Sequence, residues 1–232
     1  MTGFGIDKLK GVTCGFETEL FDSSDFDFYQ IHQPEKISRA VRKRQAEFLA
    51  GRHCAALALN SIGLYQSFAV EIGKSREPVW PDGVVGSITH SGTQAAAIVG
   101  ASGSFSGVGV DIENLVEYRV YQQISPRVLN KSERDLIHAL DVDEALLFTY
   151  IFAVKEAFFK AVFPQVGTHL GFNTITVTSL PEEISSGVVK FELNRCLSAN
   201  LTKGRVLEAQ IACTHDTEVR ALVALRKNEV DS

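Results

Sequence analysis

Residues 152–163 read Phe-Ala-Val-Lys-Glu-Ala-Phe-Phe-Lys-Ala-Val-Phe, and this stretch decides how the rest of the chain is interpreted. At about 100° per residue, Lys155, Glu156 and Lys160 fall within a wedge of roughly 140°, and apolar side chains cover the rest of the helical wheel. The spacing therefore predicts a core helix with one charged stripe. On pattern alone, this stripe is either the solvated side of an amphipathic helix or a row of functional residues.

The second informative stretch is 107–113, Gly-Val-Gly-Val-Asp-Ile-Glu. Its alternation predicts a strand with Asp111 and Glu113 on one face. Two neighbouring carboxylates repel each other unless a cation lies between them, and their hard oxygens suit Mg²⁺ or Mn²⁺. An acidic pair at the surface is the alternative. The glycines do not make a dinucleotide-binding fingerprint, because the sixth position of that pattern is Ile112.

A long helix is predicted over 35–59, after a proline near its first turn. Arg44 and Arg52 fall on its apolar face, roughly 12 Å apart along the axis. Arginines on such a face either extend to the rim and pair with a carboxylate, or bind an anion. Two guanidinium groups at this spacing are able to hold a phosphate by bidentate hydrogen bonds.

Composition narrows the class of protein. The 232 residues are 45% hydrophobic and 22% charged, as in a soluble globular protein, and no apolar run predicts a membrane span or signal peptide, so the expected location is cytoplasmic. The net charge of −5 argues against nucleic acid as a partner. The cysteines are widely spaced and are interpreted as reduced thiols; they are Cys14, Cys54, Cys196 and Cys213.

The remaining pattern indicates two similar halves, each a long helix followed by a strand meander. Strands are predicted over 84–89 and 95–99, with Thr89 and His90 at the end of the first, and over 174–180, 188–193, 206–214 and 219–225. Residues 130–133, Asn-Lys-Ser-Glu, predict a helix cap. We therefore expect an α+β fold of two pseudo-twofold related subdomains, 1–115 and 116–232, each with a helix on a small, mostly antiparallel sheet and with the active site between them.

Taken together, the motifs at 107–113 and 152–161 resemble the signature of the 4′-phosphopantetheinyl transferase superfamily, Gly-x-Asp-x-Glu followed by aromatic-x-x-Lys-Glu-x-x-x-Lys. The stretches 43–52, 76–81 and 86–91 are similar to the monomeric enterobactin-synthase type, so the resemblance covers roughly 34–175. Phe152 stands where many relatives have tryptophan, and we expect this to mark a subfamily. The resemblance implies transfer of phosphopantetheine from coenzyme A to a serine of an acyl or peptidyl carrier protein, leaving 3′,5′-ADP.

The resemblance also implies a metal site. In this family the two acidic strand positions and the helix glutamate bind magnesium, and these map to Asp111, Glu113 and Glu156. Glu156 or a water on the metal would act as the base for the serine hydroxyl. Lys155 and Lys160 would bind the coenzyme A phosphates and neutralise their charge. Asp111 would take part in coenzyme A binding as well as in metal binding.

The nucleotide end of coenzyme A maps to the N-terminal half. Arg44 and Arg52 would hold the 3′-phosphate, while Lys74 or Arg76 and the corner at Thr89 and His90 would line the nucleotide and the pyrophosphate.

Two other functions use the same residues. A metal-dependent pyrophosphohydrolase would attack the nucleotide with water and release 3′,5′-ADP from coenzyme A alone. A non-catalytic coenzyme A-binding accessory subunit would bind without modifying any carrier. We expect a monomer, and a carrier from siderophore or other secondary-metabolite synthesis, although the sequence does not select among siderophore, polyketide and fatty-acid carriers.

Overall fold

The protein is described here by a computed structural model that covers residues 6–64, 70–181, 185–214 and 217–227. The chain divides into two compact units. The first contains Ile6–Val108 together with Arg226 and Lys227, and the second contains Gly109–Leu225. The division falls after Val108 and not after Leu115 as the sequence suggested, so Asp111 and Glu113 belong to the second unit.

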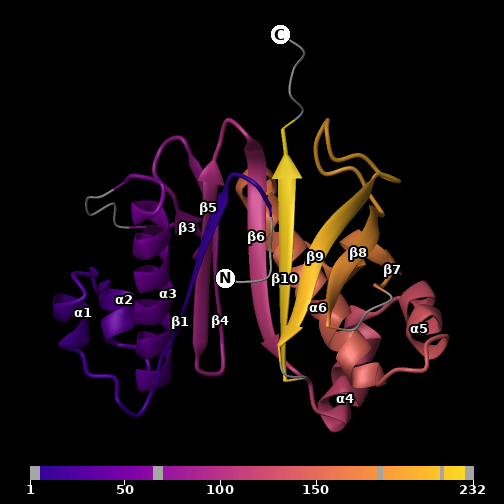
Figure 1. Cartoon of the computed structure of the whole chain (residues 1–232), viewed down its shortest axis with the longest axis horizontal. Coiled ribbons are helices and arrows are strands. Elements are labelled where there is room, and N and C mark those ends of the chain that lie inside the picture. Colours follow the sequence, from indigo (N-terminus) through magenta and orange to yellow (C-terminus); the bar gives the residue numbers. More distant parts are fainter. Residues whose placement is uncertain (1–5, 65–69, 182–184, 215–216, 228–232) are drawn as a thin grey trace. The chain divides into compact units, whose positions relative to one another are not determined.

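The first unit is built on a three-stranded antiparallel sheet in the order β1-β5-β4 (Figure 1). Its strands are β1 (Leu9–Gly15), β4 (Val84–Ser91) and β5 (Gln94–Ala101), and a separate ribbon pairs β2 (Glu71–Ile72) with β3 (Pro78–Val79). β4 and β5 form a two-residue hairpin in which Ser91 pairs with Gln94. Gly92 has a φ of +57°, which the first position of a type II′ turn requires.

Helix α3 (Arg42–Asn60) packs on this sheet through small side chains, and the short helices α1 (Asp25–Phe28) and α2 (Glu35–Ser38) pack beside it. Alanines of α3 meet alanines of β5 in the core, so helix and sheet approach closely. The prediction of one continuous helix over 35–59 is wrong. The helical conformation is interrupted between α2 and α3, where Val41 is extended, with ψ of 151°, and serves as the N-cap of α3.

The second unit holds a five-stranded sheet in the order β6-β10-β9-β8-β7, whose last four strands are antiparallel neighbours. These are β6 (Phe105–Asn114), β7 (Ile175–Ser179), β8 (Ser186–Leu193), β9 (Val206–Thr214) and β10 (Glu218–Arg226). The helices of the unit are α4 (Tyr118–Val128), α5 (Lys131–His138), α6 (Glu144–Val166) and the 3₁₀ turn η1 (Phe172–Thr174). The predicted cap is confirmed, because Asn130 and Glu133 form a reciprocal capping box at α5.

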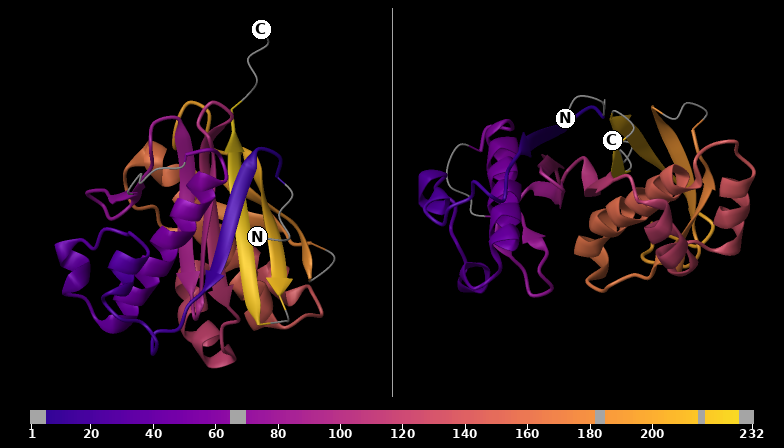
Figure 2. Two further views of the ribbon diagram at one scale, coloured as in Figure 1. Left: turned by 60° about the vertical axis from the view of Figure 1, so that its left-hand side comes forward. Right: turned by 90° about the horizontal axis from the view of Figure 1, so that it is seen from below.

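Helix α6 is the core element of the second unit, and most of its residues are buried. It lies against one face of the sheet of its unit (Figure 2). The Asp143 side chain accepts the Leu146 N–H at 2.8 Å to start the helix, and Gly167, with φ of +66°, ends it in the left-handed conformation. The predicted core helix at 152–163 is confirmed and is longer at both ends. No helix in the described part of the chain is long and apolar enough to cross a bilayer.

The sheet meets α6 backbone to backbone at Gly109. A Cβ atom added there would lie 1.8 Å from the Ala157 carbonyl oxygen and 2.7 Å from the Ala161 nitrogen. Only glycine permits this approach, because the backbone of a packed helix cannot move aside. Since side chains alternate along a strand, Asp111 and Glu113 are on the same face as Gly109 and face α6. The glycine of the motif therefore has a packing role. The predicted α+β class with antiparallel sheets is confirmed by the order and pairing of the elements.

We expect Gly109→Ala to lower the free energy of unfolding of the second unit by about 1–3 kcal/mol or more, because the methyl group forces β6 and α6 apart. Urea denaturation monitored by circular dichroism measures the loss. Gly171→Ala is the control in the same unit, since a Cβ there meets nothing within 4 Å. Equal stability of the two variants would contradict the close packing of β6 on α6.

Candidate active site

A cluster of charged side chains lies between β6 and α6. Lys160 Nζ donates to Asp111 Oδ1 at 2.6 Å and to the Val110 carbonyl oxygen at 3.1 Å. Asp111 is buried, whereas the Lys160 side chain retains 27% of its exposure. The partly exposed lysine therefore reaches from the rim of the cluster to the buried Asp111 carboxylate.

Two further carboxyl groups belong to this cluster and have perturbed acidities. Burial, then the neighbouring Asp111 carboxylate, raises the pKa of Glu113 to about 8, while Lys160 acts in the opposite direction and Glu156 adds to the increase. Burial and Asp111 likewise raise the pKa of Glu156, opposed by Lys160 and His169. Three carboxyl groups thus compete for one ammonium group, which leaves the cluster short of positive charge.

Glu156 also lines a cavity of about 340 Å³ within the second unit. The wall opposite α6 is the segment that follows the helix, including His169 and Phe172. The His169 ring stacks on Phe159 with centroids 5.4 Å apart and an interplanar angle of 12°. His169 was not predicted as a site residue, because it lies in an irregular segment and only the turn after α6 brings it back to the helix.

Lys155 has internal partners that the sequence did not indicate. The residue is only 3% exposed, and its Nζ donates to Glu133 Oε2 at 2.7 Å and to the Val128 carbonyl oxygen at 2.8 Å. Lys155 also contributes to the lining of the Glu156 cavity, and its predicted contact with a phosphate stays a prediction. Glu133, fully buried, also accepts the N–H groups of Asn130 and Val177. Burial lowers the pKa of Lys155, and Glu133 opposes this shift. Lys155 therefore joins α6 to α5 and β7 through a buried ion pair.

The three predicted metal ligands, Asp111, Glu113 and Glu156, all belong to this cluster. Within the described residues, no three His, Cys, Asp or Glu side chains are grouped closely enough to hold a metal ion as they stand. Chemically, however, the donor set fits a hard divalent cation, because Asp111, Glu113 and Glu156 offer only carboxylate oxygens and their mutual repulsion is relieved by positive charge. In the arrangement described, the Lys160 ammonium provides that charge.

The first unit carries a separate cavity of about 290 Å³ that is rich in cations. Four basic side chains line it, together with Glu47 and His90; they are Lys36, Arg44, Arg52 and Arg76. Arg44 Nη1 donates to His90 Nε2 at 2.9 Å, so the imidazole hydrogen is on Nδ1, which lies 3.8 Å from Glu47 Oε2. The prediction that Arg44 and Arg52 share one face is confirmed, and the sequence did not indicate Glu47 or Lys36 as their neighbours.

Arg52 is the most constrained of these cations. Its Cζ lies 4.8 Å from the centre of the Phe48 ring, and Nη2 donates to the Glu71 carbonyl oxygen at 3.3 Å. Arg52 Nε is buried and has no hydrogen-bond partner among the described residues. Burial, together with Arg44, lowers the pKa of Arg52 to about 10. An anion would thus meet a desolvated guanidinium group with a donor to spare.

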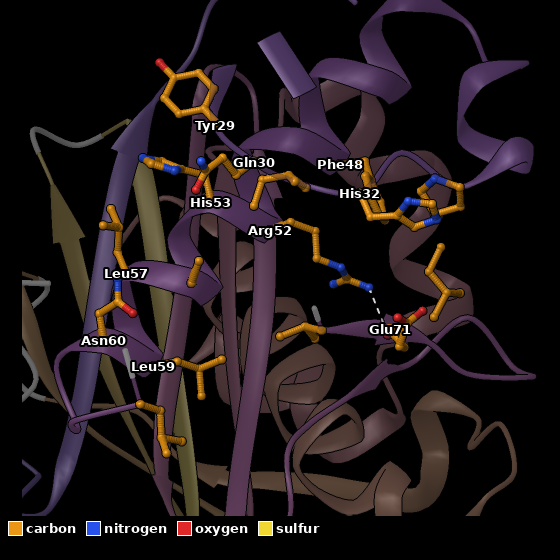
Figure 3. A pocket seen from close by; sticks show the side chains of 16 residues that line it. Tyr29, Gln30, His32, Phe48, Arg52, His53, Leu57, Leu59, Asn60 and Glu71 are labelled. Atoms are coloured by element: carbon orange, nitrogen blue, oxygen red, sulfur yellow. Dashed lines mark hydrogen bonds between the residues drawn. The ribbon is translucent and has the colours of Figure 1, made fainter. Parts of the chain in front are cut away.

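Arg52 also lines a neighbouring cavity of about 460 Å³, shown in Figure 3. There the guanidinium group points toward Glu71, with Phe48 and His32 to one side. Tyr29 contacts the ring of His53 at a centroid distance of 4.6 Å, and burial lowers the pKa of His53. Arg52 therefore lines both cavities.

Two other predicted residues lie elsewhere. Thr89 is buried, and strand alternation places it on the face of β4 opposite Ile88 and His90, which line the cation-rich cavity. Thr89 and His90 therefore do not form one corner of this cavity, because β4 continues as an extended strand to Ser91. Lys74 is exposed in the turn before β3 and does not line the cavity, whereas Arg76 does.

Comparison with known families gives the class of this protein. Residues 32–100 match a family model described as the 4′-phosphopantetheinyl transferase N-terminal domain, and residues 107–214 match the 4′-phosphopantetheinyl transferase superfamily. The chain belongs to the 4′-phosphopantetheinyl transferase superfamily. Its members use coenzyme A and act on carrier proteins, so the predicted transferase activity is confirmed.

Individual relatives agree with this assignment. Enterobactin synthase component D of Salmonella typhimurium is 36% identical over 163 residues, covering 69% of this chain and 67% of that protein. The Escherichia coli K12 protein of the same name is 34% identical, covering 66% and 71%. The 4′-phosphopantetheinyl transferase PptT of Mycobacterium tuberculosis is 37% identical, covering 61% of each chain.

The buried ion pair leads to a prediction about Lys155. Lys155→Met should lower the free energy of unfolding by about 3–5 kcal/mol, because Glu133 keeps its negative charge in the core without an opposite charge beside it. Thermal and urea denaturation measure this loss. Lys190→Met, at an exposed position on β8 in the same unit, is the control and should lose far less stability. A Lys155→Met protein that is as stable as the parent but inactive would show that this lysine acts on the substrate.

Proposed function

We propose that this chain transfers 4′-phosphopantetheine from coenzyme A to a carrier-protein serine by dividing the work between its two units. The first unit binds the nucleotide end of coenzyme A, and the second activates the pyrophosphate and the serine. The observation that carries this proposal is the division of charge: one unit has a cavity with four cations, and the other has three carboxyl groups around one lysine.

Arg44 and Arg52 are the proposed ligands of the coenzyme A 3′-phosphate. They share one cavity, and the spare buried donor of Arg52 gives a phosphate oxygen a charge-assisted hydrogen bond without displacing an internal partner. Arg76 and His90 line the same cavity and would complete the nucleotide site.

Glu156 is the proposed base for the serine hydroxyl. It lines a cavity, and its raised pKa brings its basicity closer to that suited to proton transfer near neutral pH. Lys160, which already neutralises Asp111, is the proposed partner of the phosphate on which charge increases as the pyrophosphate bond breaks.

Magnesium is proposed as the cation that the carboxylate cluster would hold through Asp111, Glu113 and Glu156. When bound, it would supply charge neutralisation for the phosphate oxygens. The support is the donor chemistry and the two raised carboxyl pKa values. The chain's own contribution is to keep the carboxylates oriented, by fixing β6 against α6 at Gly109.

The carrier is proposed to belong to siderophore or related secondary-metabolite synthesis. The support is the name enterobactin synthase component D, shared by several relatives of 34–36% identity. A monomeric state and a cytoplasmic location also stay predictions.

Incubation with coenzyme A and candidate apo-carrier domains, followed by intact mass measurement, tests the function: a gain of one phosphopantetheinyl group supports it. Release of 3′,5′-ADP without a carrier would favour a hydrolase, and binding alone an accessory subunit.

The phosphate assignment is tested with two nucleotides. Arg44→Ala and Arg52→Ala should each weaken coenzyme A binding about 10- to 100-fold, since a charge-assisted hydrogen bond is lost. Binding of 3′-dephospho-coenzyme A should change much less, because the arginines have no 3′-phosphate to hold. Isothermal titration calorimetry with both nucleotides gives the comparison.

The matched control for this test is Arg39→Ala, which removes an exposed arginine whose ion pair among the described residues is with Glu35 at the surface. It should bind both nucleotides as the parent does. If the Arg44 and Arg52 variants lost affinity for the two nucleotides equally, the 3′-phosphate would lie elsewhere.

Glu113→Gln tests the metal site through opposite effects on stability and activity. Because the folded-state pKa of Glu113 is raised to about 8, its ionisation destabilises the fold progressively from about pH 4.5 upward and fully above pH 8. Without added metal, the glutamine variant should therefore melt higher than the parent at pH 8.5 and about equally near pH 4.5.

Added Mg²⁺ should raise the melting temperature of the parent at pH 8.5 and leave that of the variant nearly unchanged. In the carrier assay, Asp111→Ala and Glu113→Gln should each reduce transfer by about 100-fold or more, since a metal ligand is lost. Near-normal transfer by Asp111→Ala at limiting Mg²⁺ would be incompatible with this site.

A further inference from the structure

Two cysteines of the first unit lie in direct contact although they are far apart in the sequence. Cys14 on β1 and Cys54 on α3 have their Sγ atoms 2.8 Å apart. This distance is shorter than the roughly 3.5–4.0 Å at which even carbon atoms make optimal contact, and only about 0.8 Å longer than a disulfide bond. The pair is formed by packing the helix on the sheet, and no sequence spacing indicates it.

The two thiols differ in access and in chemistry. Cys14 is half-buried, whereas Cys54 is completely buried. The hydrogen bond between them lowers the pKa of Cys14 and raises that of Cys54, where burial adds to the increase. Cys14 is thus the accessible thiol that ionises first, and Cys54 is its buried partner.

The surrounding backbone holds both sulfur atoms in place. Cys14 Sγ lies 3.6 Å from the Ala50 carbonyl oxygen on α3, and Cys54 Sγ lies 3.5 Å from the Ala95 carbonyl oxygen on β5. Ala95 is also the strand partner of Cys14. The Cys14 sulfur therefore contacts α3, which carries Cys54, and the Cys54 sulfur contacts β5, the strand paired with β1, so the pair lies between helix and sheet.

We propose that Cys14 and Cys54 are a peroxide-responsive thiol pair that forms a reversible disulfide between β1 and α3. The Cys14 thiolate attacks one oxygen of hydrogen peroxide, breaks the O–O bond and becomes a sulfenic acid, and the hydroxide that leaves takes up a proton to form water. Cys54 then attacks that sulfur and displaces a second water. Two thiols are oxidised and one peroxide is reduced, and a small-molecule dithiol reverses the reaction.

The disulfide would tie the helix that carries Arg44 and Arg52 to the first strand of the unit. It closes a loop between positions 40 residues apart, which removes conformational freedom from the unfolded chain. The sulfur atoms need to approach by less than 1 Å, so the native packing is little disturbed. The oxidised protein should be the more heat-resistant form.

The experiment oxidises the full chain with a small excess of hydrogen peroxide, followed by alkylation of remaining thiols under denaturing conditions. The chain has four cysteines, so two alkylated thiols, an intact mass lower by two hydrogens, and a Cys14–Cys54 cross-linked peptide are expected. The melting temperature should rise by about 5–15 °C and return on addition of dithiothreitol.

Cys14→Ser and Cys54→Ala are the variants that should lose both the mass change and the temperature shift. The double variant Cys196→Ser with Cys213→Ser should keep both, because these thiols do not belong to the pair. The proposal is overturned if the parent keeps four alkylatable thiols, if Cys14 accumulates as sulfinic acid, or if the cross-link joins other cysteines.

Discussion

The approach of β6 to α6 at Gly109 is the constraint on which the second unit depends. With no side chain at this position, strand and helix backbones touch, and the next residues of the same strand face, Asp111 and Glu113, are carried to the helix surface. Lys160 can then bond both Asp111 and the strand backbone. The carboxylates are concentrated by packing, and the electrostatic cost of that concentration is what makes the cluster attractive to a cation.

The two motif lysines illustrate how depth decides the role of a charge. Lys155 and Lys160 are on one helix and five positions apart, yet Lys155 is buried against Glu133 while Lys160 retains access to solvent. A buried, fully bonded ammonium group holds elements together and is unable to follow a reacting phosphate. A partly exposed one can exchange partners. The same helix therefore directs one lysine into the core and leaves the other partly open to solvent.

The first unit collects the opposite charge. Its cation-rich cavity is lined by residues of α2 and α3, of β2, β3 and β4, and by Arg76 in the loop between β2 and β3. Arg52 contacts the Phe48 ring and donates to the Glu71 backbone. The residues packed between α3 and β5 are small, so the helix lies close to the sheet. The same close packing brings Cys14 and Cys54 together. The proposed nucleotide site and the cysteine pair thus depend on the same helix–sheet contact.

The sequence by itself determined the core helix, most strands, the capping box at Asn130 and the family, because these depend on local periodicity and on motifs of fixed spacing. Tertiary structure decided what local pattern does not contain. Glu133 is 22 residues from Lys155, and Cys14 is 40 from Cys54, so their pairing follows from how elements pack. The face taken by Thr89 likewise depended on how far β4 extends, which is fixed by pairing with β5.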